Sequence, residues 1–103
     1  MKVKEVGAVS AVFMAGLGFY TGNDYLKLEE NSGRTYVTGI IDGLHLAFGE
    51  SPKSLKWITN CTRGKDNFQI TAIVDKFLSE NPQRWDEPMN VLVYDSLVNI
   101  CPL

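Results

Sequence analysis

Apolar residues recur at helical spacing in two long stretches of the chain. Over about residues 34–48, the members of one helix face fall at i, i+3, i+4, i+7 and i+11, and they are Val37, Ile40, Ile41, Leu44 and Phe48. A second run follows Asp66 and Gln69, which have capping-box spacing. It stops before Asn81-Pro82, and its members are Ile70, Ile73, Val74, Phe77 and Leu78. Both stretches are predicted to be amphipathic helices.

Two more helices are predicted outside these runs. A short one begins at Gly22-Asn23-Asp24, where Asn or Asp precedes an apolar stretch, and ends at Asn31-Ser32-Gly33. A longer one opens at Asp86-Glu87-Pro88, with acids and a proline in its first turn, and ends at Cys101. Its apolar face is wide enough to predict a central position, and comprises Met89, Val91, Leu92, Val93, Tyr94, Leu97, Val98 and Ile100.

The segment from Glu50 to Lys65 is interpreted as a long loop. Ser51-Pro52 stands near its start and Arg63-Gly64-Lys65 near its end, with room for a short turn or strand between them. Long loops in small domains are often functional. The predicted fold is therefore all-α: a small bundle of about four helices with one long loop.

Small residues form a stripe on the helix predicted over residues 34–48. Gly39, Gly43 and Ala47 recur every four residues, and each mid-helix glycine costs about 1 kcal/mol relative to alanine. We expect a compensating helix-packing contact through close approach of another backbone, within one chain or against a second copy. Gly49 is predicted to be the C-cap.

The composition fits one exported domain. The chain has 103 residues, a formal net charge of −2 and no low-complexity tract. Without a basic stripe, nucleic acid is excluded as the main partner. Met1-Lys-Val-Lys-Glu followed by the apolar run from Val6 to Tyr20 has the outline of a signal peptide. We predict a leader over residues 1–18 and a single domain over residues 19–103, the alternative being a buried N-terminal helix.

The two cysteines, Cys61 and Cys101, read most simply as one disulfide in an exported domain. The alternative is two unrelated buried thiols in a cytosolic protein. Two cysteines and one histidine fall short of a zinc site, so no metal or cofactor is expected. His45, the only histidine, lies in the middle of a predicted helix. No catalytic set emerges, and the sequence favours a binding protein over an enzyme.

The order of several short motifs resembles the Rap/Tai immunity proteins, a bacterial family. The start Gly22-Asn23-Asp24-Tyr25-Leu26 is similar to the family's "GN-x-L" opening, and Thr38 to Gly43 looks like its "GY-I-x-G" helix. A cysteine-bearing segment, the Leu78-to-Pro82 stretch, Pro88 and a last helix ending at Cys101 follow in the family's order. The resemblance covers about residues 22–102. A second family cysteine pair is absent, with Glu29 and Val37 in its places.

The resemblance implies a periplasmic, all-helical immunity protein without a membrane anchor once the leader is removed. Such a protein binds and inhibits a peptidoglycan amidase effector of type VI secretion by occupying the cleft of the amidase. The resemblance is also compatible with a homodimer of this protein. For the partner-binding surface we predict the Glu50–Lys65 loop, with Trp57 as its anchor and with Ser54, Lys56 and Arg63 beside it. Aromatic anchors are common in binding hot spots.

Two other functions remain open at this point. One is a periplasmic stress chaperone or structural helical protein without a toxin partner. The other is an enzyme that uses Cys61, which would require a free and reactive thiol.

Overall fold

The structure is a computed structural model that describes residues 20–103, so the predicted leader lies outside the described residues. Within that range the chain forms only helices and one isolated β-bridge, which confirms the all-α class. The elements, in chain order, are α2 (Gly22–Leu26), α3 (Glu30–Ala47), the 3-10 helix η3 (Phe48–Glu50), α4 (Pro52–Thr62), α5 (Asn67–Glu80), the 3-10 helix η4 (Pro82–Arg84) and α6 (Met89–Ile100).

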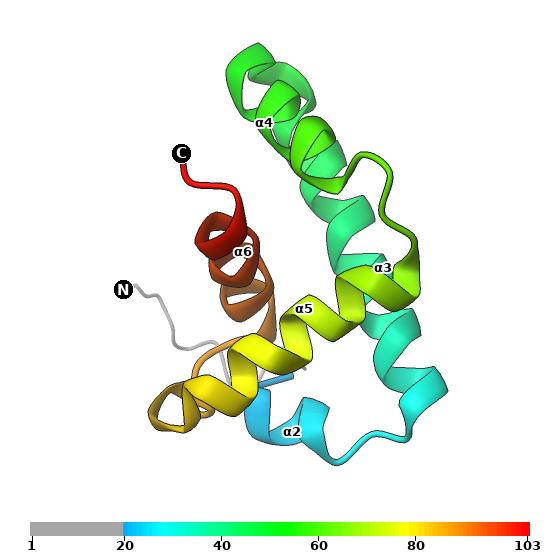
Figure 1. Ribbon diagram of the computed structural model, residues 1–103, viewed down its shortest axis with the longest axis vertical. Coiled ribbons are helices and arrows are strands. Elements are labelled where there is room, and N and C mark those ends of the chain that lie inside the picture. The colour runs from blue at the N-terminus through cyan, green and yellow to red at the C-terminus, as the bar shows by residue number, and fades with distance from the viewer. Residues whose placement is uncertain (1–19) are drawn as a thin grey trace.

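The helices pack around one core. Helix α4 runs back along the upper part of α3, α5 packs across α3, and α6 packs against both α3 and α5 (Figure 1). Each α-helix in residues 20–103 contributes buried apolar side chains to the core, which comprises Tyr25, Val37, Ile41, Ile58, Cys61, Ile70, Val74, Phe77, Leu78, Met89, Leu92, Val93 and Leu97. No helix in the described range is long and apolar enough to cross a membrane.

Helix α5 agrees most closely with its sequence signals. The Asp66 carboxylate accepts a hydrogen bond of 2.9 Å from the Gln69 backbone N–H, and the Gln69 side chain accepts one of 2.8 Å from the Asp66 N–H. This is the predicted capping box, which satisfies N–H groups that the first helical turn leaves unpaired. Helix α6 also lies where it was expected, although Pro88 is its N-cap and the two acids precede the helix.

The start of the described chain differs from the prediction. Thr21 is the N-cap of α2, and its hydroxyl and the Asp24 carboxylate form a second capping box. The helix ends at Leu26, and residues 31–33 lie in the first turns of α3 rather than in a break. A Cβ at Gly22 would come within 3.0–3.1 Å of Leu92 and the Trp85 backbone, so this glycine permits the close approach of α2 to α6.

The predicted long loop is wrong, because residues 52–62 form α4. Pro52 occupies the first turn of that helix, where a missing N–H has no cost, and so it begins the helix rather than marking a turn. Leu55, Ile58 and Cys61 then turn inward at intervals of three residues. Arg63 ends the helix, and Gly64 turns the chain with a positive φ of 75°.

The small-residue stripe makes no helix contact within the described chain. Gly39, Gly43 and Ala47 are all exposed, and a Cβ added at either glycine would meet no other atom within 4 Å. Within residues 20–103 the stripe therefore packs against no other helix, and contact with a second copy stays a prediction. The C-cap of α3 is Phe48 rather than Gly49.

Candidate functional site

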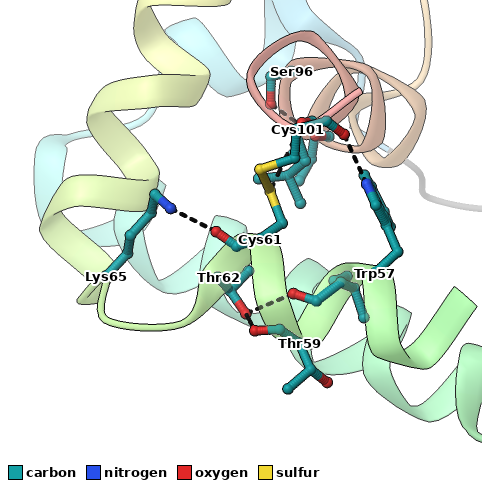
Figure 2. The surroundings of a disulfide bond; sticks show 10 residues. Trp57, Thr59, Cys61, Thr62, Lys65, Ser96 and Cys101 are labelled. Carbon is teal, nitrogen blue, oxygen red and sulfur yellow. Dashed lines mark hydrogen bonds between the residues drawn. A yellow bond between two sulfur atoms is a disulfide. The ribbon is translucent and has the colours of Figure 1, made fainter. Parts of the chain in front are cut away.

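The disulfide joins α4 to the end of α6 and so builds one side of the site. Cys61 and Cys101 are bonded, with their Cα atoms 5.8 Å apart, which confirms the predicted disulfide. The bond also means that Cys61 is not a free thiol. One turn earlier on α4, the Trp57 indole N–H donates a hydrogen bond of 2.7 Å to the Cys101 carbonyl. Figure 2 shows both side chains reaching Cys101 from the same helix. Two bonds of different kinds thus hold α4 beside α6.

An apolar groove of about 590 Å³ lies next to this junction. It is formed by the end of α3, by η3, by α4 and by the outer face of α6. Its lining residues are Leu44, Phe48, Lys53, Ser54, Trp57, Asn90, Val91, Tyr94 and Leu103. A volume in this range is typical of pockets that take a small ligand or an inserted side chain.

Three aromatic side chains shape the groove. The Tyr94 ring lies 5.5 Å from the Trp57 ring and 6.3 Å from the Phe48 ring, centroid to centroid. Such tilted and edge-to-face contacts favour one arrangement of the rings. Because the Trp57 indole also hydrogen bonds to Cys101, contacts within the chain hold the aromatic wall in one arrangement.

The predicted partner-binding residues are only partly brought together. Trp57 and Ser54 line the groove, whereas Lys56 and Arg63 are exposed and do not line it. Trp57 is half-buried and forms part of the wall, so its geometry is that of a receptor surface rather than of a projecting anchor. The predicted group also lacked Lys53, which does line the groove.

Sequence reasoning missed the α6 side of the groove. Val91 and Tyr94 lie beside the helix face that enters the core, and their apolar character was the available signal. Because the apolar face of this helix is wide, the sequence predicted that the helix is buried at the centre of the bundle. In the structure, part of that face is left open, and Val91 remains 40% exposed.

The groove offers little acid–base chemistry. No group of three His, Cys, Asp or Glu residues that could hold a metal occurs in residues 20–103. His45 lies on α3, where its ring Nδ1 is 3.0 Å from the Ile41 carbonyl of the same helix. The arrangement can bind an apolar group between aromatic walls, with a lysine at its edge.

Comparisons of the chain with protein-family models, with curated proteins and with solved structures gave no match.

Proposed function

We propose that this protein acts by binding another protein through the groove between α3, α4 and α6. The observation that carries this proposal is the fixed aromatic wall formed by Phe48, Trp57 and Tyr94. Trp and Tyr are enriched in binding hot spots. A surface that is already ordered loses less conformational freedom on binding, which leaves more of the interaction energy for affinity.

We further propose that the partner is a peptidoglycan amidase effector of type VI secretion, which the protein inhibits as an immunity protein. Support comes from the motif order that resembles the Rap/Tai immunity proteins over about residues 22–102. The bonded Cys61–Cys101 pair is compatible with the periplasm that this role requires, since disulfides persist in oxidising compartments. The predicted leader would direct the chain there.

An inhibition assay with a groove variant and a matched control tests both proposals, namely binding through the groove and inhibition of an amidase. Val91→Glu places a charge in the groove, and Phe68→Glu places the same charge on another exposed apolar residue. Both positions lie in the first turn of a helix, where an acid is favoured by the helix dipole. Both variants should therefore fold, which circular dichroism checks.

The assay measures peptidoglycan hydrolysis by a peptidoglycan amidase effector of type VI secretion, and calorimetry measures the affinity of the complex. We expect inhibition by the wild type and by Phe68→Glu. Val91→Glu should bind about 30-fold more weakly, a loss typical of a disrupted hot spot. Equal inhibition by both variants would exclude the groove as the binding site.

A wild-type protein that leaves the amidase fully active would overturn the immunity role. If that same protein suppressed the aggregation of an unfolded substrate, the result would favour the periplasmic chaperone instead.

A further inference from the structure

The positive charge of the molecule is concentrated on α4 and the turn after it. Lys53, Lys56, Arg63 and Lys65 all fall between Glu50 and Asp66, and no acidic residue lies among them. The chain as a whole has a formal net charge of −2. This short segment therefore has the opposite sign to the protein that carries it.

Two of these cations, Lys53 and Lys56, are exposed on the half of α4 that borders the groove, whereas Arg63 and Lys65 follow the end of the helix. On an α-helix, positions three or four apart share a face, so Lys53, Lys56 and Asn60 form a polar stripe next to Trp57. Lys53 also lines the groove itself. Any group that enters the groove thus meets the Lys53 side chain, and Lys56 follows one turn later on the same helix.

Both arginines outside this segment of the described chain already have acidic partners. Arg34 pairs with Glu30, and Arg84 pairs with Glu87 and Asp95 at 2.7 and 2.5 Å. Lys65 donates a hydrogen bond of 2.6 Å to the Cys61 carbonyl. Within residues 20–103, no ion pair involves the remaining α4 cations.

We infer that the groove receives an acidic segment of the partner protein that carries a bulky apolar side chain. The apolar side chain enters between Trp57, Val91 and Tyr94, and the flanking carboxylates face Lys53 and Lys56. This inference rests on the proposed function, because it takes the groove as the docking site. Complementary charge at the edge of an interface speeds encounter and selects the partner.

A protein segment fits this surface better than an anionic lipid bilayer does. A helix that lies on a membrane exposes an apolar face to the acyl chains. The apolar residues of α4, namely Leu55, Trp57, Ile58 and Cys61, instead turn toward the protein. The apolar feature here is a concave groove, which accepts an inserted side chain.

Titration with defined peptides tests the inference on the full chain. The probe peptide is acetyl-Glu-Glu-Asp-Leu-Phe-Asp-Glu-Glu-amide. One control peptide has lysine at every acidic position, and the other has alanine in place of Leu-Phe. The peptides carry no nitrogen-15 label, so the amide and indole signals in a nitrogen-15 NMR spectrum of the labelled protein report binding at Trp57 without overlap.

The protein variants are matched in charge. Lys53→Gln/Lys56→Gln removes two cations beside the groove, and Lys27→Gln/Lys76→Gln removes two exposed cations elsewhere. We expect the acidic peptide to shift signals of α4 and α6 and both control peptides to fail. Loss of two exposed ion pairs should weaken binding about fivefold in the first variant and leave the second unchanged. Raising NaCl from about 20 mM to about 300 mM should weaken wild-type binding, because salt screens these charges.

Equal binding of the lysine peptide, or equal affinity of the two double variants, would overturn the inference. So would binding to phosphatidylglycerol vesicles in place of the peptide, which would identify a membrane surface as the ligand. Amidase inhibition without peptide binding would remove only this inference. Peptide binding without amidase inhibition would instead remove the immunity role.

Discussion

The disulfide gives the sharpest prediction of stability. Replacing Cys61 and Cys101 together with alanine removes a crosslink between residues separated by 40 positions. In the chain-entropy model, freeing a loop of that size lowers the free energy of unfolding by about 4 kcal/mol. For a domain of this length, whose total stability is about 5–15 kcal/mol, that is a large share.

The structure also indicates which part of the fold should loosen first when the disulfide is removed. Helix α4 keeps its contacts with α3 and η3 when the bond is absent, because those contacts do not depend on the cysteines. Its connection to α6 then rests on the hydrogen bond between the Trp57 indole and the Cys101 carbonyl and on the contact between the Trp57 and Tyr94 rings. We therefore expect Trp57 fluorescence to shift to longer wavelength in the variant while the other helices stay folded.

Urea unfolding followed by circular dichroism measures the effect. The variant should have a lower transition midpoint. Wild-type protein unfolded in reductant should fall to the same midpoint, and reductant should not change the variant. A loss below about 1 kcal/mol, with an unchanged dependence on urea, would refute the reasoning that the bond acts by restricting the unfolded chain.

Three further predictions concern single residues. Gly64→Ala should cost about 1 kcal/mol, because Gly64 has a φ of 75° that disfavours a Cβ. Gly43→Ala should instead stabilise the protein by about 1 kcal/mol, since this position is helical and has open space around it; thermal unfolding of both variants checks the opposite signs. Burial, and then the hydrogen bond of 2.8 Å that the Tyr25 hydroxyl donates to Asp75, raise the pKa of Tyr25. The folded state holds the Tyr25 hydroxyl proton more tightly than the unfolded state does. The contribution of this group to the free energy of unfolding is therefore complete below the ordinary tyrosine pKa of about 10 and is lost as pH rises above it. Tyr25→Phe should therefore flatten the alkaline fall in the urea midpoint, and identical pH profiles would contradict this assignment.

The sequence predicted those helices whose signals are local. Helix α5 has a capping box, an unbroken apolar face and a proline after its end, so each signal indicates the same boundaries. Helix α4 was missed because Pro52 is equally compatible with a turn and with the first position of a helix. Its inward residues also include Cys61, which was interpreted as a disulfide partner and not counted in an apolar pattern.

The groove could not be predicted because its walls come from segments far apart in the chain. Leu44 and Phe48 end α3, Trp57 lies on α4, and Tyr94 lies on α6. Only the packing of these helices decides which part of a wide apolar face stays open. Local spacing indicated that α6 had more apolar surface than one core contact needs, but not which side of it would face solvent.

The position of the two cysteines in the chain sets an order of assembly. Cys101 follows all of the described helices, whereas Cys61 lies on α4, so the bond can close only after α5 and α6 have been made. The groove needs that closure to hold α4 beside α6. Its final shape is therefore acquired at the last step of maturation, and an incomplete or reduced chain would not yet present the surface that a partner recognises.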